Sequence, residues 1–223
     1  MRDRLPNIHR GVGALLVVIP AILLTASRTA MVAAFVAFVF ALVTFRAADP
    51  AYRLASALAI AALAAGPLLL APAPQRNRLQ TLPAELNRGT FHGRTRIWKT
   101  GLKVLKRHPI LGVGSGAYPE AVAPWLGTPG VPGAQYVAHN TFLSVLVESG
   151  IIGFALFSLL AVFLVIFIGA MPFPERALWA VMLAVWAVGV STLTWEQYKP
   201  TWLVVALITT EWARSYWPAR RQP

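Results

Sequence analysis

Long apolar stretches separated by short polar segments dominate the hydrophobic pattern of this chain. A bilayer core of about 30 Å needs roughly 20 apolar helical residues. Stretches that reach or approach this length cover residues 11–26, 29–45, 54–71, 141–171, 177–193 and 201–212. The pattern predicts an all-α integral membrane protein, organised as a single membrane domain with about six transmembrane helices.

One long connection, residues 72–139, interrupts the apolar pattern. In its middle part, from Arg94 to Arg107, apolar residues share one helical face and basic residues lie elsewhere, which predicts an amphipathic helix in the membrane interface. The next part, GVGSGAYPEAVAPWLGTPGVPG, is rich in glycine and proline and is predicted to be irregular. Its GVGSGAY segment lacks the lysine and hydroxyl residue of a Walker motif, so we interpret it as a turn.

The charge balance fits a membrane protein better than a nucleic-acid-binding protein. The chain has 20 Lys and Arg against 8 Asp and Glu, but only 13% of its residues are charged and 57% are hydrophobic. Because apolar runs divide the basic residues into short clusters, we expect no nucleic-acid partner. Alternating six spans from an inside N-terminus leaves most short-loop positive charge in the cytoplasm and places the long connection outside. The absence of cysteine excludes disulfides and thiolate chemistry.

A few polar residues stand where chemistry is plausible. Arg28 lies between two apolar runs, where a charge is costly unless it serves a function, pairs, or snorkels to the headgroups. His139 ends the outer connection and is a candidate general base, because histidine exchanges a proton near neutral pH. Asn140 beside it also fits a helix N-cap. Glu148 is an intramembrane carboxylate that is functional, protonated or paired with an arginine.

Other sequence features carry weaker signals. Gly150 and Gly153 favour close helix packing. Glu196 is a further candidate that could reach the outer face beside Trp195. The sequence contains no HExxH motif and no histidine cluster, so we predict no metal site.

Three segments resemble the bacterial O-antigen ligase and polymerase family. HN followed after nine residues by GIIG, starting at His139, resembles the family's H[NSQ]x9GxxG pattern. LLTASRTA around Arg28 resembles its T-x-S-R-G segment, with Thr29 where glycine is usual. Residues 93–118 resemble its GR-x-x-x-W segment followed by P-x-x-G-x-G. The three segments occur in the family's order.

The resemblance implies a glycosyltransferase in the bacterial inner membrane, with several spans, a periplasmic active face and no metal or cofactor. It would transfer a glycan from undecaprenyl pyrophosphate to a sugar hydroxyl of an acceptor such as the lipid A core. Arg28 and Arg94 would bind the pyrophosphate, and His139 would act on the acceptor hydroxyl. The further candidate substrate contacts are Arg96, Lys99 and Asn140. Arg96 is also the alternative to Arg94 as the key arginine of the loop.

Several functional alternatives stay open. A polysaccharide polymerase of the same family uses the same donor with a growing lipid-linked chain as acceptor, and protein glycosylation is a related possibility. A non-catalytic membrane subunit or an inactive truncated remnant belongs to a different class. Family members have about twice as many spans, so we expect a second chain that supplies N-terminal helices, a truncated product, or a compact version that works alone. The other expected partners are the lipid-linked donor, the glycan acceptor and membrane lipid.

Overall fold

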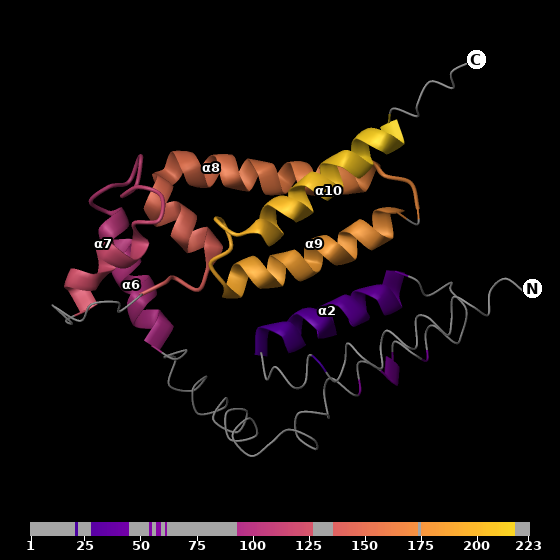
Figure 1. The fold of residues 1–223 in the computed structure, drawn as a ribbon, viewed down its shortest axis with the longest axis horizontal. Helices are drawn as coiled ribbons and strands as arrows, with labels where there is room; N and C mark the ends of the chain where they lie inside the picture. Colours follow the sequence, from indigo (N-terminus) through magenta and orange to yellow (C-terminus); the bar gives the residue numbers. More distant parts are fainter. Residues whose placement is uncertain are drawn as a thin grey trace, which may run out of the picture. The chain divides into compact units, whose positions relative to one another are not determined.

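In the computed structural model the described part of the chain is all-α, as the sequence predicts. The structure describes residues 21, 28–44, 54, 57, 58, 61, 93–126, 136–173 and 175–216. The chain divides into two compact units, Met1–Leu82 with Ala180–Val188, and Pro83–Trp179 with Gly189–Pro223. The first unit contains α2 (Arg28–Thr44), which matches the predicted span 29–45 (Figure 1). The predicted spans 11–26 and 54–71 lie outside the described residues, apart from a few isolated helical positions.

Two helices of the described part are long and apolar enough to cross a membrane, α8 (Thr141–Ala170) and α9 (Glu175–Thr192). Their bounds lie close to those of the predicted spans 141–171 and 177–193. α10 (Lys199–Tyr216) extends beyond the predicted span 201–212 at both ends and does not meet the same criterion. It packs along α8, where the rings of Phe167 and Trp212 stack with their centroids 4.3 Å apart. The six-span topology stays a prediction.

Helix α8 is broken at Gly150, which has φ 63° and ψ −165°. Glycine adopts this left-handed backbone readily because it has no Cβ. Before the break most residues are buried, whereas after it large apolar side chains such as Leu156 (64% exposed) and Val165 (59% exposed) face outward. The part after the break has about 20 residues and is about 30 Å long, which matches a bilayer core.

The long connection contains two helices, α6 (Arg94–Leu105) and α7 (Tyr118–Leu126). α7 contradicts the prediction that this glycine- and proline-rich part is irregular. Pro119 lies in the first turn, where a missing N–H leaves no helical hydrogen bond unmade. Tyr118, Val122 and Leu126 recur at four-residue spacing along α7 and are all buried, so they form one packed face of this helix.

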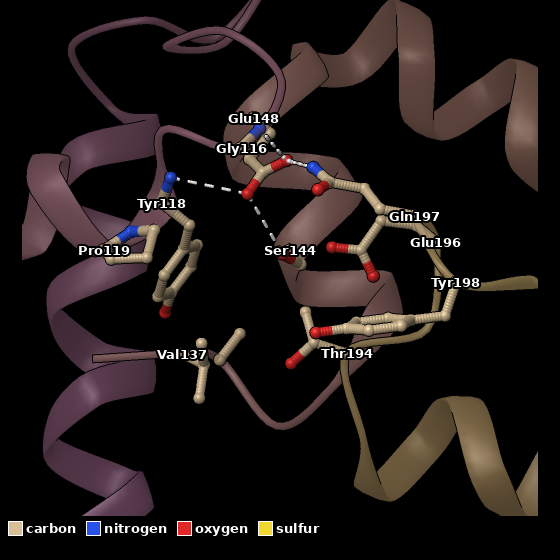
Figure 2. Close-up of a pocket in the computed structure, with 11 residues that line it drawn as sticks. Gly116, Tyr118, Pro119, Val137, Ser144, Glu148, Thr194, Glu196, Gln197 and Tyr198 are labelled. Atoms are coloured by element: carbon tan, nitrogen blue, oxygen red, sulfur yellow. Dashed lines mark hydrogen bonds between the residues drawn. The ribbon is translucent and has the colours of Figure 1, made fainter. Parts of the chain in front are cut away.

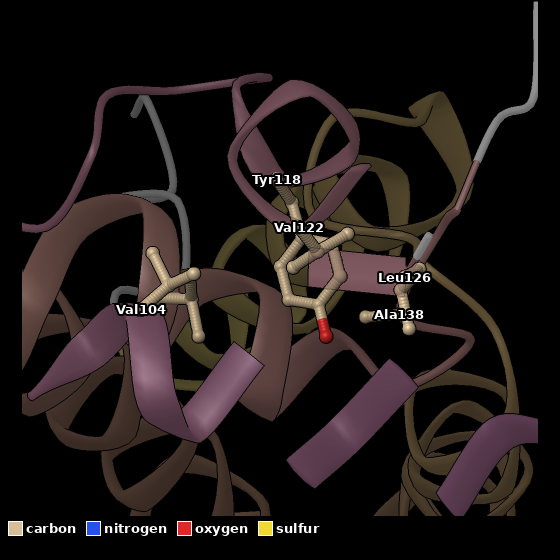
Figure 3. Close-up of a cluster of buried hydrophobic side chains, with 6 residues drawn as sticks. Val104, Tyr118, Val122, Leu126 and Ala138 are labelled. Carbon is tan, nitrogen blue, oxygen red and sulfur yellow. The ribbon is translucent and has the colours of Figure 1, made fainter. Parts of the chain in front are cut away.

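The apolar face of α6 packs inside the protein. Val104 joins the buried residues of α7, Ala138 and Val147 in one cluster (Figure 3). Gly101 permits the close approach of α7, because a Cβ there would contact the Tyr118 ring. The predicted helix is therefore confirmed. The sequence predicts that its apolar face lies in the membrane interface, but α7 and α8 cover most of this face. Leu102 remains 45% exposed.

The loop after α6 interlocks with the break in α8. The N–H groups of Val113 and Gly114 donate to the carbonyls of Val147 and Glu148, at 3.1 and 2.8 Å. In the other direction, the N–H of Ile151 donates to the Pro109 carbonyl at 2.9 Å. The loop thus replaces hydrogen bonds that α8 loses at its break.

Two glycines make this interlock possible. A Cβ on Gly112 would overlap the Glu148 backbone, and a Cβ on Gly150 would overlap the Ile110 carbonyl. We expected Gly150 to allow two helices to pack closely, but it admits the backbone of a loop instead. At Gly153 an added Cβ would meet the side chain of Ser149, one turn earlier in α8.

Candidate functional site

His139 lies immediately before the N-cap of α8, and two hydrogen bonds hold the peptide group that joins it to Ala138. The φ of 48° places His139 in the left-handed region, which non-glycine residues rarely adopt. Its N–H donates to Thr194 Oγ1 at 3.2 Å. The carbonyl of Ala138 accepts a hydrogen bond from Trp98 Nε1 at 2.6 Å. Such unusual backbone persists where surrounding contacts over-determine it, and it is frequent at functional sites.

The residues after His139 are tied to the connection between α9 and α10. Asn140 Oδ1 accepts from the Leu143 N–H at 2.9 Å, which confirms the N-cap interpretation, and Asn140 Nδ2 donates to the Ser191 carbonyl at 3.3 Å. Thr141 Oγ1 donates to the Leu193 carbonyl and accepts from the N–H of residue 195, at 2.9 and 2.7 Å. A substrate contact by Asn140 stays a prediction.

Arg94 is the first residue of α6 and lies near His139. Its guanidinium Nη1 donates to the Thr192 carbonyl at 3.4 Å. Burial lowers the pKa of Arg94 below its usual value. Burial also lowers the pKa of His139, and the positive charge of Arg94 lowers it further. His139 is therefore mainly neutral near pH 7, which is the form that can accept a proton.

The other predicted basic residues occupy different surroundings. Arg96 is exposed, and its Nη2 donates to the Leu126 carbonyl at 2.9 Å, at the C-terminal end of α7. Lys99 is exposed on α6. Arg28 begins α2, in the other unit, and its side chain is outside the described part of the chain. Within the second unit, the structure brings together only Arg94 and His139 from the predicted catalytic set.

Glu148 is 5% exposed and is engaged by groups of the protein itself. One carboxylate oxygen accepts from the Gly116 N–H at 2.8 Å and from Gln197 Nε2 at 3.4 Å. The other accepts from the Tyr118 N–H and the Ser144 hydroxyl, both at 3.4 Å. The sequence left open a pairing of Glu148 with an arginine, but none of its partners among the described residues is an arginine. The predicted glycine turn is confirmed, and its amides bind an internal carboxylate.

A cavity of about 100 Å³ lies between the glycine turn, the start of α8 and the α9–α10 connection. Figure 2 shows Glu148 and Ser144 on one wall, Tyr118 on a second, and Glu196 with Tyr198 on a third. Burial raises the pKa of Glu196 and the nearby charge of Glu148 adds to this rise, while hydrogen bonding from Ser144 and Thr141 partly offsets it.

Sequence reasoning singled out Glu148, Glu196 and the GVGSGAY turn but missed the other polar residues of this cavity. Thr194, Ser144 and Gln197 belong to no motif, and they reach the cavity from two distant segments. Their only sequence signal is that they are polar residues next to long apolar runs. Among the residues that the structure describes, no group of three or more His, Asp or Glu side chains is placed to hold a metal ion.

Comparison with known proteins agrees with these motifs. A family model described as O-antigen ligase matches residues 13–158, a range that includes Arg28, Arg94 and His139. The chain is also 36% identical over 78 residues to the exopolysaccharide production protein ExoQ of Rhizobium meliloti (strain 1021). That match covers 33% of this chain and 18% of the relative's length. No solved structure matches the chain significantly. Because the family model covers more than half of the chain, this protein belongs to the O-antigen ligase family.

Proposed function

We propose that this protein is an inner-membrane glycosyltransferase that moves a glycan from undecaprenyl pyrophosphate to a sugar hydroxyl at the periplasmic face. The observation that carries the proposal is that Arg94 and His139 lie near each other, because Arg94 donates to the Thr192 carbonyl and the His139 N–H donates to Thr194, two residues further on. One group suits a phosphate, and the other, kept mainly neutral, suits a hydroxyl proton. Family membership supports a role in making a bacterial polysaccharide.

The proposed reaction exchanges one bond at the anomeric carbon of the donor sugar for another. The bond between this carbon and a pyrophosphate oxygen breaks while the acceptor oxygen forms the new glycosidic bond. His139 takes the hydroxyl proton, a contribution worth about 10²–10⁴-fold in rate. Arg94 stabilises the negative charge on the departing pyrophosphate through bidentate hydrogen bonds, and Arg28 contributes a second guanidinium. In this proposal the arginines supply the positive charge, so no metal ion is needed.

The acceptor distinguishes two versions of this function. In the ligase version it is a sugar of the lipid A core, and in the polymerase version it is a growing lipid-linked polysaccharide. The name of the Rhizobium relative concerns exopolysaccharide production, which favours the polymerase version as the second candidate. A partner chain that supplies further helices is compatible with both versions. Equal glycan transfer with and without the chain would instead favour a non-catalytic subunit or an inactive remnant.

Arg94→Ala is expected to lower glycan transfer more than 100-fold, while Arg96→Ala is expected to retain most of the activity. The two arginines lie two residues apart on α6, but only Arg94 lies near His139. Loss of the hydrogen bond from Arg96 to the Leu126 carbonyl should lower stability by about 1 kcal/mol and leave the proposed donor site intact. The measurement is the transfer rate in membranes, normalised to the amount of membrane-inserted protein.

A lysine at position 94 provides a second test of the phosphate contact. Arg94→Lys should recover only part of the activity, because an ammonium group cannot form the bidentate fork. Wild-type activity in Arg94→Ala, or an equal loss in Arg96→Ala, would contradict the role proposed for Arg94.

The proposed topology places the α6–α7 region in the periplasm and the α8–α9 turn in the cytoplasm. The chain has no native cysteine, so single cysteines can be introduced as reporters. Glu120→Cys on α7 and Phe173→Cys after α8 replace exposed residues. In intact cells with a permeabilised outer membrane, an impermeant thiol reagent should label only the first variant. Labelling of Phe173→Cys alone would reverse the proposed orientation.

A further inference from the structure

The proposed chemistry assigns no role to the cavity beside His139. Its volume is about 100 Å³. One water molecule needs roughly 10–15 Å³ by the same kind of measure, so the cavity has room for about seven to ten waters. The ring of a single hexose with its hydroxyl groups occupies a comparable space. Gly116, Gln197 and Tyr198 at the rim are exposed, so the cavity is accessible to a ligand from solution.

The lining offers the contacts that a sugar uses. Carboxylates, hydroxyls and a side-chain amide come from α8 and from the α9–α10 connection, and Tyr118 and Tyr198 add aromatic surface (Figure 2). Sugar hydroxyls donate to carboxylates, while the C–H face of a sugar ring packs against apolar and aromatic surface. Pockets for small molecules combine such surface with a few convergent polar groups.

Glu196 holds the unused hydrogen-bonding capacity of this cavity. Hydrogen bonding from Ser144 and Thr141 reaches its carboxyl group, but its Oε2 atom is buried and has no hydrogen-bond partner among the described residues. Leaving a buried acceptor unsatisfied is costly, so a ligand hydroxyl donated to this atom would be stabilised. Glu148 differs, because protein groups already engage both of its oxygens. Glu148 therefore shapes the wall, and Glu196 is the group left to recognise a ligand.

The cavity is joined to His139 through the backbone. Ala138, the residue before His139, lines it, and so does Thr194, whose hydroxyl accepts the His139 N–H. Two carboxyl groups in one cavity also disfavour an anionic ligand, whereas Arg94 favours one. The charges thus separate a region suited to a neutral sugar from a region suited to pyrophosphate.

We propose that this cavity binds a neutral hexose ring of the acceptor, and that Glu196 determines its specificity by accepting a hydrogen bond from a ring hydroxyl. The assignment to the acceptor, rather than to any other sugar, rests on the proposed glycosyltransferase function.

Binding of simple sugars to the full chain in detergent tests the cavity without requiring catalysis. The probes are the methyl glycosides of glucose, galactose and mannose, followed by saturation-transfer NMR. We expect the wild type and His139→Ala to bind at least one of the three, and Glu196→Gln to bind it at least tenfold more weakly. Glu211→Gln is the matched control, because Glu211 pairs with Arg214 on α10 and does not line the cavity.

The outcomes separate this inference from the proposed function. Hexoside binding that depends on Glu196, in a chain that transfers no glycan, supports the sugar site and counts against the glycosyltransferase. Failure of the wild type to bind any of the three hexosides overturns the site, as does unchanged binding in Glu196→Gln. If Glu196→Gln does not fold, Gln197→Ala at the rim gives the same test, with weaker binding supporting the site and unchanged binding overturning it. In an active chain, Glu196→Gln should raise the KM for acceptor at least tenfold while leaving kcat nearly unchanged.

Discussion

Gly150→Ala is expected to separate α8 from the loop that follows α6 and to destabilise the protein by about 3 kcal/mol or more. The φ of 63° is strained for alanine, and its Cβ would overlap the Ile110 carbonyl. The backbone hydrogen bonds that join the loop to Val147, Glu148 and Ile151 would be lost with this contact. The measurement is thermal unfolding of the purified protein in detergent, where Tm should fall by about 10 °C or more.

The same helix contains a matched control for this substitution. A Cβ added to Gly169 meets nothing within 4 Å, so Gly169→Ala should leave Tm unchanged or raise it slightly through better helix propensity. Gly112→Ala, on the opposite side of the interlock, should behave like Gly150→Ala, because its Cβ would overlap the Glu148 backbone. Equal Tm values for Gly150→Ala and Gly169→Ala would contradict the interlock.

The apolar pattern predicted helices well and breaks in helices poorly. The stretches 29–45, 141–171 and 177–193 became α2, α8 and α9 because long apolar runs leave the backbone few ways to satisfy its polar groups except a helix. The break at Gly150 depends on a loop that lies about 40 residues earlier in the chain, which local periodicity cannot show. α7 was missed because glycine and proline content outweighed the four-residue spacing of its buried face, which begins at Tyr118.

The sequence also predicted only part of the candidate site. The motifs identified Arg94 and His139, and the structure places them close enough to affect the pKa of the histidine. Asn140 is the N-cap of α8, which the local sequence pattern predicts as one of its two possible roles. Thr194 and the unpaired oxygen of Glu196 could not be foreseen, because their roles arise from the packing of the α9–α10 connection against α8. The approach of Arg28 to this site stays a prediction.

His139→Ala is expected to lower glycan transfer by about 10²–10⁴-fold without lowering the amount of protein in the membrane. The lost group is the proposed base, while the backbone contacts to Trp98 and Thr194 need no imidazole. His108→Ala, at an exposed histidine in the loop after α6, is the control and should transfer at the wild-type rate.

The pH dependence of transfer provides a related check. Burial and the charge of Arg94 lower the pKa of His139 below its usual value of about 6.5, so the base becomes protonated at a lower pH than a free histidine does. The acid limb of the rate profile should therefore lie below about 6.5. Removing the positive charge with Arg94→Gln should raise the pKa of His139 in an NMR titration, whereas Arg94→Lys should leave it low.

Transfer of a labelled glycan tests the central claim most directly. Membranes from bacteria that lack their own copy of the gene would carry the wild type or His139→Ala at equal levels. They would receive an undecaprenyl-pyrophosphate glycan and the membrane's own acceptors. The account predicts that the wild type transfers label to an acceptor and releases undecaprenyl pyrophosphate in equal amount, and that His139→Ala does neither above background. Equal transfer by the two proteins would contradict it.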